Sequence, residues 1–91
     1  MQVIDKVFPI TTNINSKGKL EIGGCDIESL AKKYQTPFYL FDTAHIEKVC
    51  DEYKNEFNKI YDNTQVVYGS KAFANKSIFK LILDKGLGVD V

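Results

Sequence analysis

Apolar positions along this chain follow two different periods. Residues 1–24 show no helical period; β-branched and apolar residues alternate with others on both sides of a glycine-containing break at 16–19. The alternating positions are Ile10, Thr12, Ile14, Leu20 and Ile22. This pattern predicts a β-hairpin or two short strands around a glycine turn.

A helical period begins after Gly23 and Gly24. Asp26 is a suitable N-cap, and the apolar residues that follow are spaced i, i+3, i+4 and i+7: Ile27, Leu30, Ala31 and Tyr34. The pair Thr36–Pro37 ends this helix, because a residue before proline disfavours the α region. The run 38–41, Phe-Tyr-Leu-Phe, predicts a short buried strand, with an aromatic binding patch as the alternative.

The longest helix is expected to start at Asp42 or Thr43. Apolar residues predict one stripe along it: Ile46, Val49, Cys50, Tyr53, Phe57 and Ile60. Charged residues fill the other side and predict a solvated face: Glu47, Lys48, Asp51, Glu52, Lys54 and Glu56.

The run 65–70 comes directly before Lys71, and its β-branched and aromatic residues predict a buried strand. Asn75 is a plausible N-cap for a helix reaching about Lys85, and Gly86 is a suitable C′ residue. The order strand, helix, strand predicts that 89–91 pairs parallel to the lysine strand. In parallel α/β sheets chemistry lies at the carboxyl ends of strands, so Lys71 is a candidate catalytic residue. The alternative is a solvated surface lysine.

Four motifs in sequence resemble the alanine-racemase-like, pyridoxal-phosphate-dependent decarboxylases, and most closely the diaminopimelate decarboxylases. They are Leu-Glu-Ile-Gly-Gly at 20–24, Tyr-Gln-Thr-Pro-Phe-Tyr-Leu-Phe-Asp at 34–42, Val-Val-Tyr-Gly-Ser-Lys-Ala-Phe at 66–73 and Gly-Leu-Gly-Val-Asp-Val at 86–91. The sequence departs from the family pattern at Gln35, where glycine is usual, and at Phe73, where many members have asparagine.

The resemblance implies an α/β fold: residues 25–91 would start a pyridoxal-phosphate-binding (β/α)₈ barrel, and residues 1–24 would form strands of a separate β domain. It further implies decarboxylation of meso-diaminopimelate to lysine, with pyridoxal 5′-phosphate bound covalently to Lys71 and Asp90 beside the cofactor. A homodimer is expected for the full-length enzyme. A complete barrel takes about 250 residues, so this chain of 91 residues resembles an N-terminal fragment that is inactive alone.

Composition changes this picture little. The chain is 44% hydrophobic and 26% charged, with zero formal net charge. These values are ordinary for a globular domain and give no footprint for nucleic acid. The sequence shows neither a signal peptide nor an apolar run long enough for a membrane span, so a cytoplasmic protein is expected. Cys25 and Cys50 are expected to be buried or partly buried free thiols. His45 lacks ligand partners at metal-site spacing, so no metal is expected.

Two other functions remain open at this stage. The first is decarboxylation of another basic or carrier-bound amino acid by the same chemistry. The second is a small non-enzymatic α/β interaction module in which Lys71 is merely exposed.

Overall fold

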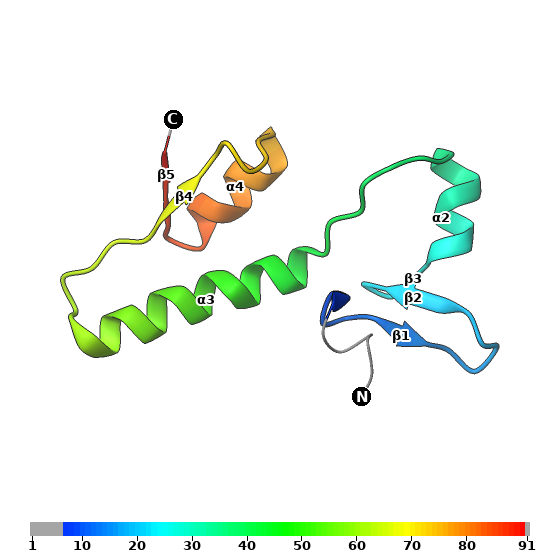
Figure 1. Cartoon of the computed structure of the whole chain (residues 1–91), viewed down its shortest axis with the longest axis horizontal. Coiled ribbons are helices and arrows are strands. Elements are labelled where there is room, and N and C mark those ends of the chain that lie inside the picture. The colour runs from blue at the N-terminus through cyan, green and yellow to red at the C-terminus, as the bar shows by residue number, and fades with distance from the viewer. Residues whose placement is uncertain (1–6, 91) are drawn as a thin grey trace. The chain divides into compact units, whose positions relative to one another are not determined.

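The computed structural model describes residues 7–90 and contains both helices and short strands (Figure 1). It divides into two compact units, Met1–His45 and Ile46–Val91. The mixed α/β class predicted from the sequence is confirmed. Residues 1–6 of the expected β segment and Val91 of the last expected strand lie outside the described residues.

The first unit contains a three-stranded antiparallel sheet in the order β1 (Asn13–Ile14), β2 (Leu20–Ile22) and β3 (Cys25–Asp26). Asn13 pairs with Glu21 and Glu21 pairs with Asp26. The predicted hairpin is therefore confirmed. The third strand was not expected, because the two glycines after β2 suggested a boundary, whereas their φ values of 61° and 78° place them in the turn between β2 and β3.

The turn between β1 and β2 is organised by one side chain. Asn15 Oδ1 accepts hydrogen bonds from the backbone N–H groups of Lys17 and Lys19, at 2.9 and 3.0 Å. Gly18 has a φ of 75°, a conformation that glycine adopts without a Cβ penalty. The polar break between the alternating apolar segments thus encodes this reversal directly.

Helix α2 spans Ile27–Tyr34 as predicted. The Asp26 carboxylate accepts a hydrogen bond of 2.9 Å from the Glu28 N–H and caps the first turn. At the other end Gln35 adopts φ 63° and ψ 146°, in a region that strongly favours glycine. This conformation gives a physical reason for the glycine that the resembled family usually has here. The following Thr36–Pro37 peptide bond is cis.

The prediction of a buried strand at residues 38–41 is wrong for this structure. The four residues form no β-ladder, and all are exposed, with Tyr39 at 92%. An apolar run becomes a buried strand only where a neighbouring strand and a covering layer are available. The three strands that the structure describes in this unit pair only with one another.

Side-chain hydrogen bonds in this unit also join the segment before β1 to the start of α3 (Thr43–Ile60). The Thr11 hydroxyl donates to Asp42 Oδ2 at 2.7 Å and accepts a hydrogen bond from the Gly23 N–H, also at 2.7 Å. Asp42 is nearly buried, and its other carboxylate oxygen accepts from the Ala44 N–H at the start of the helix. The Ile10 N–H donates to His45 Nδ1 at 3.0 Å.

The second unit is a strand–helix–strand motif packed against α3. Strand β4 (Val67–Gly69) pairs in parallel with β5 (Gly88–Asp90), and α4 (Lys76–Asp84) connects them. The predicted parallel pairing and the N-cap at Asn75, whose Oδ1 accepts from Ile78 N–H at 2.8 Å, are confirmed. Four buried apolar residues form the core: Cys50, Ile78, Ile82 and Leu87.

The C-terminus of α4 closes in a Schellman motif. The Gly86 N–H donates to the Leu83 carbonyl at 2.9 Å, and the Leu87 N–H donates to the Ile82 carbonyl at 3.2 Å. Gly86 has a φ of 83°, as expected of a C′ residue. Lys54 Nζ donates to the Lys85 carbonyl at 2.6 Å, so this cation of α3 satisfies a free carbonyl at the negative end of the helix.

The apolar stripe predicted along α3 divides between two environments. Cys50 is buried and Ile46 packs against the core, whereas four other members are exposed: Val49, Tyr53, Phe57 and Ile60.

The predicted solvated face of α3 also needs correction. Asp51 forms an ion pair of 2.8 Å with Lys85, whose side chain is only 26% exposed. Asp51 and Lys54 therefore both attach α3 to the C-terminal end of α4.

Within residues 7–90, no helix combines the length and apolar character that a bilayer crossing requires.

Gly86→Ala is expected to destabilise the chain by more than Gly18→Ala, which is the matched control. Both residues have positive φ, so each alanine costs about 1 kcal/mol. A Cβ at Gly18 meets open space, whereas one at Gly86 lies 2.9 Å from Lys54 Nζ. Lys54 must then move and lose its bond to the Lys85 carbonyl. Urea unfolding followed by circular dichroism measures both costs, and equal costs would contradict a role for Lys54.

Gln35→Gly is expected to stabilise the chain by about 1 kcal/mol, because relief of the strained backbone exceeds the entropy cost of glycine. Gln35→Ala is the control and is expected to leave stability nearly unchanged, since alanine keeps the Cβ at φ 63°. Thermal unfolding of the three proteins makes the comparison. A lower midpoint for the glycine variant would show that this backbone conformation carries no strain.

Candidate functional site

Lys71 lies in the turn that follows β4, two residues beyond the last strand residue, Gly69. The turn is closed by a backbone hydrogen bond of 3.2 Å from the Ala72 N–H to the Gly69 carbonyl. Lys71 is exposed. The predicted position of this lysine, at the carboxyl end of a parallel strand and ahead of a capped helix, is therefore what the structure shows.

The β4–β5 pair has one covered face and one open face. Val66, Tyr68 and Val89 pack against the core on the covered side. On the other side Val67 is 52% exposed, and it shares this face with Gly69 because side chains alternate along a strand. The alternation stops before Lys71, which belongs to the turn.

The open face carries little side-chain bulk beside Lys71. A Cβ built on Gly69 meets no atom within 4 Å, so the space above this residue is free. A Cβ on Gly88 would lie 3.0 Å from Gln65 Nε2 and 3.5 Å from Val67 Cγ2. The side chains of Gln65 and Val67 therefore fill the space beside Gly88, and the open position next to the Lys71 turn is the one above Gly69.

Asp90, the second candidate residue, lies directly across the strand pair from Gly69. Neighbouring strands are about 4.8 Å apart, so Asp90 and the Lys71 turn lie at the same end of the pair. The Ser70 hydroxyl donates a hydrogen bond to the Asp90 backbone carbonyl. Within residues 7–90, no ion pair joins Lys71 to Asp90. The structure brings the two backbone positions together without holding their charges in contact.

Two side chains in the same unit have a raised pKa: Cys50 in α3, and Lys85 at the C-cap of α4. Burial raises the pKa of the Cys50 thiol, and the negative charge of Asp51 raises it further. The hydrogen bond to Asp51 raises the pKa of Lys85. Both shifts favour the protonated form: Cys50 stays a neutral thiol in the core, and Lys85 stays a cation in its ion pair.

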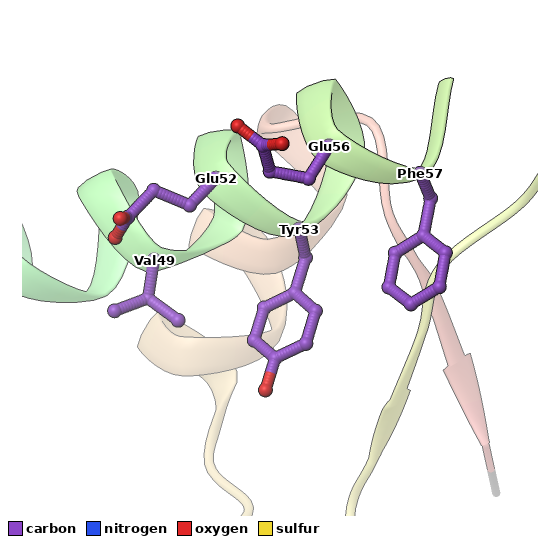
Figure 2. A pocket seen from close by; sticks show the side chains of 5 residues that line it. All are labelled: Val49, Glu52, Tyr53, Glu56 and Phe57. Atoms are coloured by element: carbon purple, nitrogen blue, oxygen red, sulfur yellow. The ribbon is translucent and has the colours of Figure 1, made fainter. Parts of the chain in front are cut away.

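A separate hollow of about 310 Å³ lies on the exposed face of α3 (Figure 2). The five lining residues all come from this helix: Val49, Glu52, Tyr53, Glu56 and Phe57. The rings of Tyr53 and Phe57 extend from the same side of the helix and are almost parallel, with centroids 6.3 Å apart. The sequence pattern placed these aromatic residues on the apolar stripe of the helix and did not predict the hollow, which contains no part of the Lys71 turn.

The chain is similar in sequence to several proteins named diaminopimelate decarboxylase. It is 44% identical over 84 residues to the diaminopimelate decarboxylase of Bacillus methanolicus, which covers 92% of this chain and 19% of that protein. It is 41% identical over 81 residues to the Bacillus subtilis protein of the same name, covering 89% of this chain and 18% of the relative. The Synechocystis protein of that name is 34% identical over 86 residues, or 93% of this chain and 18% of the relative.

No family profile matches the chain. The resemblance inferred from the four motifs is nevertheless confirmed, because relatives with one shared name cover almost the whole chain. The chain spans about a fifth of the length of these relatives, which is consistent with an N-terminal portion.

The two cysteines are expected to differ in reactivity. Cys25 is exposed, whereas Cys50 is buried and has a raised pKa, so less of it is thiolate at a given pH. A disulfide reagent at pH 8 is expected to modify Cys25 at least about tenfold faster than Cys50, which reacts as the structure opens. Cys25→Ser isolates the slow reaction, and urea is expected to accelerate it. Rapid modification of this variant in buffer would contradict the burial of Cys50.

Proposed function

We propose that this chain, which is related by sequence to a portion of the diaminopimelate decarboxylases, carries the cofactor lysine of a decarboxylase that converts meso-diaminopimelate to lysine. The observation that carries the proposal is the position of Lys71. It follows a parallel strand, next to the open position above Gly69, within the motif that resembles the cofactor-lysine stretch of the family.

In this proposal Lys71 holds pyridoxal 5′-phosphate through its side-chain amine, which suits lysine because a deprotonated amine is a nucleophile. The bound cofactor supplies an electron sink for the carbanion left when carbon dioxide departs. The open position above Gly69 would leave room beside Lys71 for the cofactor. With the cofactor bound, the Asp90 carboxylate at the same end of the strand pair would favour a proton on the nitrogen that joins Lys71 to the cofactor, because a nearby negative charge stabilises a cation.

The larger architecture belongs to the same proposal. Strands β4 and β5 would be neighbouring strands of a (β/α)₈ barrel that starts within residues 25–91, and the strands in residues 1–24 would belong to a separate β domain. The complete enzyme would be a cytoplasmic homodimer. Residues 1–91 alone would not turn over substrate, because a barrel of about 250 residues is needed to surround the site.

A non-enzymatic interaction module is the second candidate, and the exposed hollow on α3 is the observation that favours it. This alternative gives Lys71 no special chemistry. It therefore predicts that pyridoxal 5′-phosphate binds Lys71 no more tightly than it binds other exposed lysines. Under this alternative, Lys71→Ala leaves the binding of pyridoxal 5′-phosphate to the complete protein unchanged.

Lys71→Ala in the complete enzyme is expected to abolish the visible absorbance of the lysine-bound cofactor and to lower decarboxylation by at least about 10³-fold, since the nucleophilic amine is lost. Lys76→Ala, an exposed lysine at the start of α4, is the matched control and should retain both. Absorbance spectra and release of carbon dioxide are the measurements. An unchanged spectrum in Lys71→Ala would remove this residue from the site.

Asp90→Asn in the complete enzyme is expected to lower the pH at which the cofactor absorbance changes, because loss of the carboxylate makes the proton on the lysine nitrogen easier to remove. Catalysis should weaken more than folding stability. A spectrophotometric pH titration and a thermal unfolding curve test the two parts. If the variant titrates like the unsubstituted enzyme, Asp90 is only the last residue of β5 and has no part in the chemistry.

A further inference from the structure

Two hydroxyl groups hold the turn that carries Lys71. On one side of the lysine, the Tyr68 hydroxyl donates to the Phe73 carbonyl at 2.6 Å, so this bond spans the turn. Closer to the lysine, the Ser70 hydroxyl donates to the Asp90 carbonyl and ties the turn to the end of β5. The Phe73 carbonyl follows Lys71 in the same loop and the Asp90 carbonyl belongs to β5, so the two bonds restrain the turn at two separate points.

The Tyr68 ring packs against the core on the covered side of the strand pair, and Ser70 is half-buried. On the open side, no atom lies within 4 Å of the position above Gly69. A backbone hydrogen bond from the Ala72 N–H to the Gly69 carbonyl also closes the turn. The turn that carries Lys71 is thus restrained next to a free space.

We propose that Tyr68 and Ser70 are positioning residues for Lys71: their hydroxyls fix the turn so that the lysine amine is presented toward the open face of β4 and β5. This inference rests on the proposed function, in which that amine binds pyridoxal 5′-phosphate. Neither hydroxyl is required to touch the cofactor. Ser70 restrains the chain just before Lys71 through its bond to the Asp90 carbonyl, and Tyr68 restrains the chain after Lys71 through its bond to the Phe73 carbonyl.

The variants Tyr68→Phe and Ser70→Ala remove one hydroxyl each and keep the remaining side chain almost intact. Ser70→Thr keeps a hydroxyl and is the rescue variant. Tyr61→Phe and Ser77→Ala are matched controls, since both residues are exposed and lie outside the turn. All five are made in the complete enzyme, together with Lys71→Ala.

The first measurement is the dissociation constant for pyridoxal 5′-phosphate, with borohydride trapping and peptide mass analysis to show how much of it is bound at Lys71. Loss of one hydrogen bond is expected to weaken binding about fivefold in Tyr68→Phe and in Ser70→Ala. The threonine variant and the two controls are expected to bind within about twofold of the unsubstituted enzyme.

The second measurement needs no cofactor. Amide hydrogen exchange at Ala72 reports directly on closure of the turn, and it is expected to be about fivefold faster in Tyr68→Phe and Ser70→Ala than in the controls. Exchange of amides within α4 separates this local effect from global unfolding. A merely structural role would accelerate both regions together.

Three outcomes overturn the inference. The first is unchanged cofactor affinity in Tyr68→Phe and Ser70→Ala while Lys71→Ala loses the cofactor, which leaves the proposed function intact. The second is equal acceleration of exchange in the turn and in α4. The third is retention of the cofactor by Lys71→Ala, which overturns the proposed function and the positioning role with it.

Discussion

The parallel pairing of β4 with β5 depends on how the chain leaves α4 at Gly86. There the last turn of the helix is closed by the Schellman bonds, and Lys54 from α3 donates to the carbonyl of Lys85. The lysine amine approaches so closely that any Cβ on Gly86 would conflict with it. Because the next residue, Leu87, enters the core, this reversal sets the register that brings Asp90 opposite Gly69.

The elements whose signals are local were predicted well. Asp26 and Asn75 cap α2 and α4 through their own side chains, and Gly86 ends α4 with its own backbone conformation. Such signals act within one turn of chain, so the sequence contains them in full. The position of Lys71 after a parallel strand was predictable for the same reason, since strand, cap and helix follow one another directly.

The errors concern contacts between segments that lie far apart in sequence. The period of α3 identified its apolar residues but not which of them meet the core, so exposed Tyr53 and Phe57 shared one predicted stripe with buried Cys50. Lys54 was assigned to solvent because its partner, a helix-terminal carbonyl, appears only when α4 ends beside it. The hydroxyl bonds of Tyr68 and Ser70 were missed likewise, because their acceptors are backbone atoms that no side-chain pattern reveals.

The exposed run at residues 38–41 has a consequence for synthesis of the protein. In the structure these four apolar residues join no β-sheet among residues 7–90, and Tyr39 is 92% exposed. An extended and uncharged segment of this kind can pair with the same segment of another chain. We therefore expect residues 38–41 to be a site of self-association from the time they leave the ribosome.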